Sequence, residues 1–143
     1  MRYNELCTLT ESQIDDLLGL MKELNAEIPV TAQTQQRAVA SPGTRIFIAE
    51  NDAKQIVGCA TLCVYESPTG RKASVEDVVV LPAYRGQGIG RTLLERIINF
   101  ARTKLAPIDL RLTSNPTRTE ANALYQALGF EKRDTNVYKM EIK

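Results

Sequence analysis

Histidine is absent from this sequence of 143 residues, and its absence excludes several kinds of active site. Ser-His-Asp triads, Cys-His pairs and the zinc sites of H-E-x-x-H motifs all require an imidazole. Any acid or base in this protein must therefore be Asp, Glu, Tyr, Lys or Cys. Carboxylates and tyrosine hydroxyls become the first candidates for proton transfer.

Cysteine is also scarce, since the chain has only Cys7, Cys59 and Cys63. An odd number without framework spacing argues against a disulfide scaffold and is compatible with a reducing compartment. Three thiolates are fewer than the four ligands that zinc usually takes, so we expect no metal. All three cysteines are instead predicted to be small buried hydrophobic residues.

Long apolar runs and an excess of one charge are missing as well. No run approaches the roughly 20 residues of a membrane span, and the first residues lack the apolar segment of a secretory signal, so we expect a cytoplasmic protein. With 18 basic and 17 acidic side chains, no overall field favours nucleic acid or a membrane surface as a partner. The length and the 43% hydrophobic content predict a single domain over residues 1–143.

The pattern of elements changes half-way along the chain. Thr10 and Gln13 form a T-x-x-Q capping box before apolar residues at helical spacing. Farther on, three β-rich runs predict an antiparallel meander, and the second half alternates helix and strand. The predicted strands are 3–9, 44–50, 55–66, 73–81, 107–114 and 131–142, and the predicted helices are 11–25, 31–40, 88–104 and 117–128.

Three glycines at alternate positions, Gly86, Gly88 and Gly90, stand between a predicted strand and an amphipathic helix in "LPAYRGQGIGRTLLERI". First-turn N–H groups of a helix have no intrahelical partner, and glycines let an anion approach them, so phosphate or pyrophosphate is the natural ligand. Arg85 and Arg91 add positive charge at the same place. The alternative is that the glycines only allow a tight turn between strand and helix.

The spacing of this loop distinguishes it from other phosphate-binding loops. A Walker A loop has G-x-x-x-x-G-K-[ST], and this sequence has neither the lysine nor the hydroxyl residue after Gly90. A dinucleotide fingerprint has G-x-G-x-x-G near the start of a βαβ unit, whereas this loop follows a meander in mid-chain. The spacing therefore disfavours ATP and NAD.

The stretch "VVVLPAYRGQGIGRTLLE" resembles the signature of the GNAT superfamily of acyl-CoA-dependent N-acyltransferases, and "ANALYQALGF" (Ala121–Phe130) resembles its second motif. The resemblance implies the α/β (α+β) GNAT-like fold, with a mixed, mostly antiparallel central sheet of about six to seven strands flanked by about four helices. It also implies acetyl-CoA as cosubstrate, with its pyrophosphate in the loop. The loop residues carried over are Arg85, Gly86, Gln87, Gly88, Ile89 and Gly90, next to Arg91.

In the family, the strand before the loop splays from its neighbour and pairs with the pantetheine arm of the cofactor. That role falls on Val78, Val79 and Val80 by resemblance. Asn122 could also bond the pantetheine. The sequence departs from the family here, because the position seven residues before the motif tyrosine, often asparagine, is Arg118, so either residue could make this contact.

Acetyl transfer to an amine needs a neutral amine and a proton for the departing thiolate. By resemblance, Tyr125 is the tyrosine that protonates the sulfur of coenzyme A; the alternative is an aromatic residue packed in the core. The strand "VEDVVV" is similar to one in glucosamine-phosphate acetyltransferases, and we favour Glu76 as base, directly or through a water; a structural carboxylate is the alternative. Glu76 and Asp77 are adjacent in a strand, which predicts side chains on opposite faces.

The predicted function is N-acetylation of a primary amine of a small molecule or peptide, by direct attack in a ternary complex. An acidic pair favours a cationic acceptor, although Arg71, Lys72 and Arg133 could bind one sugar phosphate. The alternative function is a non-catalytic acyl-CoA-binding sensor or scaffold. The habit of the family favours a homodimer.

Overall fold

A five-stranded sheet organises residues Met1–Leu112, the first of two units into which the chain divides; the second is Thr113–Lys143. The computed structural model describes all 143 residues. The sheet has the strand order β1-β2-β3-β4-β5, antiparallel except that β5 runs parallel to β4. Its strands are β1 (Arg2–Glu5), β2 (Thr44–Glu50), β3 (Ile56–Ser67), β4 (Gly70–Val80) and β5 (Leu110–Arg111). The predicted meander is confirmed as β2-β3-β4.

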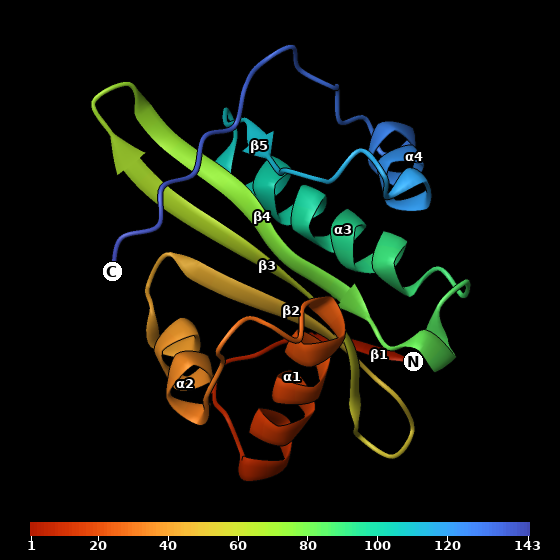
Figure 1. The fold of residues 1–143 in the computed structure, drawn as a ribbon. Coiled ribbons are helices and arrows are strands. Elements are labelled where there is room, and N and C mark those ends of the chain that lie inside the picture. The colour runs from red at the N-terminus through yellow and green to blue at the C-terminus, as the bar shows by residue number, and fades with distance from the viewer. The chain divides into compact units, whose positions relative to one another are not determined.

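Helices cover both faces of this sheet (Figure 1). Helices α1 (Glu11–Leu24) and α2 (Ala32–Ala40) lie on one face, and α3 (Ile89–Phe100) lies on the other and continues as a π-helical turn, Ala101–Leu105. The predicted capping box of α1 is confirmed, because Gln13 N–H donates to Thr10 Oγ1 at 3.2 Å and Thr10 N–H donates to Gln13 Oε1 at 3.0 Å. The predicted fourth helix is α4 (Thr119–Ala127) in the second unit.

Apolar side chains fill the space on both sides of the sheet. On the α1 face, Leu17 and Leu20 belong to one buried cluster with residues of the strands. On the other face, the lack of a side chain at Gly58 lets α3 approach closely, because a Cβ there would lie 3.2 Å from Ile89 Cγ2. The apolar stripe predicted for α3 is confirmed as buried: Ile89, Leu93, Leu94, Ile97 and Ala101. This packing fixes where the glycine loop ends and α3 begins.

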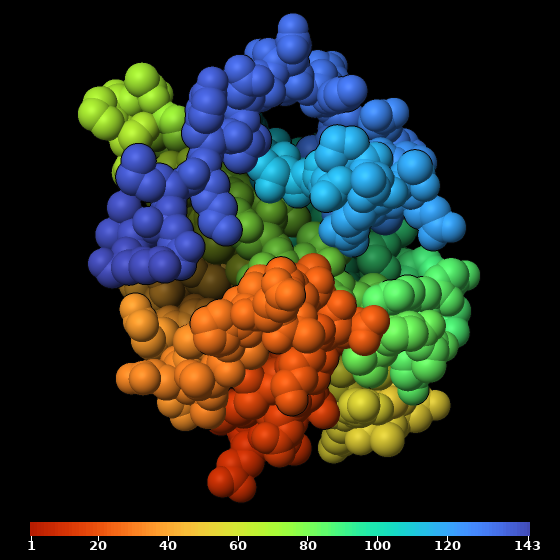
Figure 2. Space-filling view, viewed as in Figure 1, coloured from red at the N-terminus to blue at the C-terminus, as the bar shows by residue number.

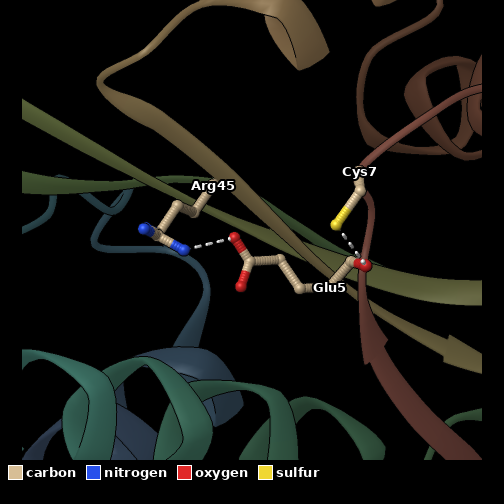
Figure 3. Close-up of polar contacts among 3 residues, drawn as sticks. All are labelled: Glu5, Cys7 and Arg45. Carbon is tan, nitrogen blue, oxygen red and sulfur yellow. Dashed lines mark hydrogen bonds and ion pairs between the residues drawn. The ribbon is translucent and has the colours of Figure 1, made fainter.

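Figure 3 shows a polar contact that joins the first two strands. Arg45 on β2 donates to Glu5 Oε1 on β1 at 2.7 Å, and its guanidinium lies 4.4 Å from the centre of the Phe100 ring at the end of α3. Cys7 lies just beyond β1, with its Sγ 3.9 Å from the Glu5 carbonyl oxygen. Cys7 is exposed, so the prediction that it is buried is wrong.

The predicted fold class is confirmed, but the predicted six to seven strands are five. The predicted strand 107–114 is reduced to Leu110–Arg111, and residues 131–142 form no strand. Strand propensity becomes a strand only where a neighbouring backbone completes the hydrogen bonds. The apolar residues that suggested this strand are all exposed: Val137, Tyr138, Met140 and Ile142. The structure contains no helix of the length and apolarity that a membrane crossing requires.

Candidate active site

The glycine loop joins β4 to α3 through a short 3-10 turn, Pro82–Tyr84. Gly86 and Gly88 have φ of +77° and +78°, a conformation that other residues rarely adopt, and a Cβ at either would point into open space. Gly88 is the N-cap of α3 and offers no side chain to cap it. The first intrahelical bond runs from Thr92 N–H to the Gly88 carbonyl at 3.0 Å, so three N–H groups, those of Ile89, Gly90 and Arg91, have no partner in the helix.

Two arginines border these N–H groups. Arg85 donates from Nε to the Val80 carbonyl at 3.0 Å and forms an ion pair with Glu23 of α1 at 3.1 Å, which holds the loop against β4 and α1. Figure 2 shows the green surface of the loop next to the orange surface around α1 and α2. Arg91 pairs with Glu95, one helical turn on, at 2.8 Å. A guanidinium has five N–H donors, so both arginines keep donors for an anion.

Gln87 and Ile89, the two other loop residues implied by the family resemblance, differ in their exposure. Gln87 is exposed, whereas the Ile89 side chain, in the first turn of α3, is buried next to Gly58 of β3. Only the backbone N–H of Ile89 is therefore available to a ligand. The loop as a whole suits a pyrophosphate, because its donors converge at the positive end of a helix and no side chain blocks them.

The outer edge of β4 opens towards its carboxyl end. β5 pairs only with Ala73 and Ser74, and within the first unit no strand follows β4 beyond that point. Leu81 N–H bonds to Val57 of β3, so by alternation the backbone groups of Val79 also face β3, while those of Val78 and Val80 point outward. The Val80 carbonyl accepts from Arg85. Of the three residues predicted to contact pantetheine, Val78 and the N–H of Val80 therefore have free backbone groups on this edge, and the contact itself stays a prediction.

A β-bulge interrupts β4 at the two carboxylates. From Cys59 to Thr61 on β3, the facing residues on β4 run from Val79 to Glu76, so β4 contains one extra residue. Asp77 has a φ of +51°, in the left-handed region that Asp tolerates better than most residues. The alternation on which the opposite-face prediction rested is therefore broken at this point.

Strand register fixes the face of Glu76, and the charges of both carboxylates act on Cys63. Cross-strand partners point the same way, so Glu76 shares a face with Thr61 and Ser74 shares it with Cys63. Burial raises the pKa of Cys63, a hydrogen bond from Thr44 opposes this, and the charges of Glu76 and Asp77 raise it further. Both charges therefore act on the Cys63 thiol, and the statement that only one of the two carboxylates faces the cleft stays a prediction.

Glu76 and Asp77 are both exposed at the surface, but the carboxyl group of Asp77 is partly desolvated. Burial raises the pKa of Asp77, and the neighbouring charge of Glu76 raises it further. Glu76 differs in accepting a hydrogen bond from the Ser74 hydroxyl at 2.5 Å, whereas the Asp77 carboxylate accepts none. A carboxyl group with a raised pKa is a frequent mark of an acid or base. Sequence reasoning missed this distinction, and the only available signal was an Asp inside a run of β-branched residues.

In the second unit, α4 carries the remaining predicted residues. Tyr125 is buried, makes an edge-to-face contact with Phe130 at 6.1 Å, and makes no hydrogen bond through its hydroxyl. Burial raises the pKa of Tyr125, and the charge of Arg118 opposes this, so the hydroxyl keeps its proton at neutral pH. Asn122 donates from Nδ2 to the Asn115 carbonyl at 3.0 Å, which ties the start of α4 to the preceding turn and leaves its side-chain oxygen free.

The model of the acetyltransferase (GNAT) domain matches residues 42–132, so this chain belongs to the GNAT acetyltransferase family. Among curated proteins, it is 32% identical to the N-alpha-acetyltransferase RimI of Mycobacterium tuberculosis over 67% of the chain and 58% of that protein. It is also 32% identical to the glucosamine 6-phosphate N-acetyltransferase of Trypanosoma brucei brucei, over 70% of the chain and 73% of that protein.

Among solved structures, a putative acetyltransferase from Agrobacterium tumefaciens superposes with a TM-score of 0.82 at 26% identity, covering 96% of this chain and 99% of that one. The chain spans 34–58% of the length of the first curated relatives that it matches.

Proposed function

We propose that this protein transfers the acetyl group of acetyl-CoA to a primary amine of a small molecule or a peptide, by direct attack of the amine in a ternary complex. The observation that carries the proposal is the start of α3, where three unpartnered N–H groups converge with Arg85 and Arg91 on an unobstructed loop. Such a site suits the pyrophosphate of coenzyme A. The family match spans both units, which supports a single domain over residues 1–143.

The residues present fit the rest of the cosubstrate as well. Acetyl-CoA supplies an acetyl group that is already activated as a thioester. The outward backbone groups of Val78 and Val80 would hold its pantetheine arm as a neighbouring strand holds another. In the second unit, the free side-chain oxygen of Asn122 or the guanidinium of Arg118 would add a contact to the arm.

Three side chains would handle protons. An amine acceptor arrives as an ammonium ion, and the charges of Glu76 and Asp77 would attract it to the exposed polar face of the sheet. Its raised pKa makes Asp77 the better base, acting directly or through a water, with Glu76 as the neighbouring charge that raises this pKa. Tyr125 keeps its proton at neutral pH and would deliver it to the departing sulfur.

The state of the cysteines supports direct attack over an acyl-cysteine intermediate. Burial, with a contribution from the charge of Asp77, raises the pKa of Cys59 to about 12. Burial and the two carboxylates also raise the pKa of Cys63. A thiol must ionise to become a nucleophile, so neither cysteine is suited to accept the acetyl group.

Binding and chemistry are tested separately. Acetyl-CoA, coenzyme A, ATP and NADH are added one at a time, and thermal unfolding is followed; a ligand at about 100 times its Kd adds about 2.7 kcal/mol to the unfolding free energy. We expect only acetyl-CoA and coenzyme A to raise the melting temperature. A larger rise with ATP or NADH would refute the proposal.

Tyr125→Phe then distinguishes an enzyme from a sensor. In an enzyme, the loss of the proton donor lowers kcat on the order of 10²-fold while acetyl-CoA affinity is kept. An acyl-CoA sensor would keep its affinity but show no thiol release with any amine, in the wild type or in the variant. Cytoplasmic location and a homodimer stay predictions, which fractionation and sedimentation would test.

A further inference from the structure

A second group of charged residues lies at the end of β4 remote from the glycine loop. Between the β3–β4 turn and the start of β5 there is a cavity of about 250 Å³, lined by Thr69, Arg71, Lys72, Asp109 and Arg111. Three of these side chains are positive and one is negative. None of the three cations forms an ion pair in the structure, where the ion pairs are Arg45–Glu5, Arg85–Glu23 and Arg91–Glu95.

The cations are held in place by neutral oxygens. Arg71 donates to the Leu105 carbonyl at 2.8 Å. Lys72 donates from Nζ to Ser67 Oγ at 2.7 Å and to Thr69 Oγ1. An arginine has five N–H donors and an ammonium has three, so donors remain on both, and Arg111 makes no side-chain hydrogen bond at all. Positioned cations with free donors and no counter-charge are the features of an anion site, and arginine suits phosphate and carboxylate groups in particular.

The strand register connects this cavity to the face of the two carboxylates. Arg111 of β5 pairs with Ser74, and Lys72, Ser74 and Glu76 are spaced by two residues on β4. Side chains two apart in a strand share a face, so Lys72 and Arg111 point to the side of the sheet that also carries Glu76. At about 3.3 Å per residue, Lys72 and Glu76 are roughly 13 Å apart along the strand. Before the bulge at Asp77, nothing reverses this alternation.

We propose that Lys72 and Arg111 bind an anionic group of the acceptor whose amine lies at Glu76 and Asp77; Arg71 alternates to the other face of β4 and only borders the cavity. The inference rests on the proposed acetyl transfer. The acceptor that fits both ends is an elongated amine with a carboxylate or phosphate about 13 Å from its nitrogen, the length of about four residues of extended peptide. Asp109 limits the positive charge of the cavity and would disfavour anions that approach from its side.

The cavity is tested first, without reference to acetyl transfer. Inorganic phosphate is titrated into the isotope-labelled full chain, and backbone amide shifts are followed by NMR. We expect saturable shifts at residues 69–72 and 109–111, distinct from any at the glycine loop. The double variant Lys72→Met/Arg111→Gln should lose the first set and keep the second. Shifts confined to the loop, or no saturable shift at the cavity, would overturn the inference even if acetyl-CoA binds as proposed.

Acceptor preference is tested next with alanine pentapeptide amides that differ only at the fifth residue: glutamate against glutamine, and phosphoserine against serine. We expect the anionic peptides to have a KM roughly tenfold lower, as charged hydrogen bonds suggest, at similar kcat. The double variant should remove this preference and leave the neutral peptides unchanged. Arg102→Gln, at an exposed arginine beyond α3, is the control with a single lost charge and should keep the preference.

The outcomes distinguish failure of the anion site from failure of the proposed acetyl transfer. Equal kinetics for anionic and neutral peptides, or acetylation of none of them, would refute an elongated anionic acceptor. Failure of acetyl-CoA to bind would refute the proposed function, and the phosphate map of the cavity would stand independently of it.

Discussion

Asp77→Asn is the most informative single change in the proposed site. Asparagine keeps the shape of the side chain and tolerates the left-handed backbone at this bulge, where φ is +51°, so the variant should fold as the wild type does. It removes the negative charge and the capacity to accept a proton. If Asp77 is the base, kcat/KM should fall by roughly 10²- to 10⁴-fold, with acetyl-CoA affinity unchanged.

The pH dependence makes the same test quantitative. Protonation of the base stops it from working, so the wild-type kcat/KM should fall as pH drops through the raised pKa of Asp77, above the ordinary value of 3.8. Glu76→Gln removes a neighbouring negative charge, which should move the midpoint of this acid limb to lower pH. The pKa of Asp77 should stay partly raised in this variant, because burial is the larger cause of the rise. Asp77→Asn should abolish the limb.

Stability gives an independent measurement of the same carboxyl group. Because its pKa is raised on folding, the folded protein binds this proton more tightly than the unfolded chain does. That contribution favours folding below about pH 3.8 and is lost as pH rises through the folded pKa. Asp77→Asn should therefore raise the melting temperature at pH 7, with a smaller effect near pH 3.

Several outcomes would refute this reasoning. Asp77 is not the base if Asp77→Asn keeps both the wild-type rate and the acid limb, or if Glu76→Gln alone abolishes activity. The latter result would return the role of base to Glu76. Glu66→Gln, at an exposed carboxylate on β3, is the matched control and should change neither the rate nor the limb.

Other predictions follow from the glycines and cysteines. Gly43→Ala places a Cβ 2.4 Å from a backbone carbonyl on β3 and should lower the free energy of unfolding by about 1–3 kcal/mol. Gly19→Ala, in open space within α1, should raise this free energy by about 0.5–1 kcal/mol. Urea denaturation measures both changes. Gly88→Ala should cost about 1–2 kcal/mol through its positive φ and also weaken coenzyme A binding, seen by calorimetry; undiminished affinity would contradict the loop assignment. In the native protein a thiol reagent should modify exposed Cys7 quickly and Cys59, with its pKa near 12, only after unfolding; rapid loss of both thiols would contradict the buried environment.

Local signals made the helices and the loop predictable. The capping box at Thr10 depends on residues three apart, and the stripe of α3 depends on helical periodicity. The glycine loop was also predictable, because Gly86 and Gly88 do adopt the positive φ that only glycine takes easily. In each case the interacting residues are neighbours in sequence, so the sequence contains the whole interaction.

The bulge at Asp77 depends on non-local pairing instead. No glycine or proline marks it in "VEDVVV", and it exists because β3 and β4 pair with unequal numbers of residues. The same limit applies to residues 131–142, whose apolar pattern predicts a strand that the structure does not form. Pairing is decided by which backbone lies alongside, and a pattern on one segment cannot supply that information.

The sequence by itself determined the helices and the positive-φ glycines of the loop, because these depend on contacts within a few residues. Only the tertiary structure decided that β4 bulges at the two carboxylates, that Arg85 holds the loop to α1, and that Arg111 joins Arg71 and Lys72 around a cavity. Each of these depends on strand register or on packing between distant segments. The free energy of such contacts belongs to the assembled sheet and to no single stretch of the chain.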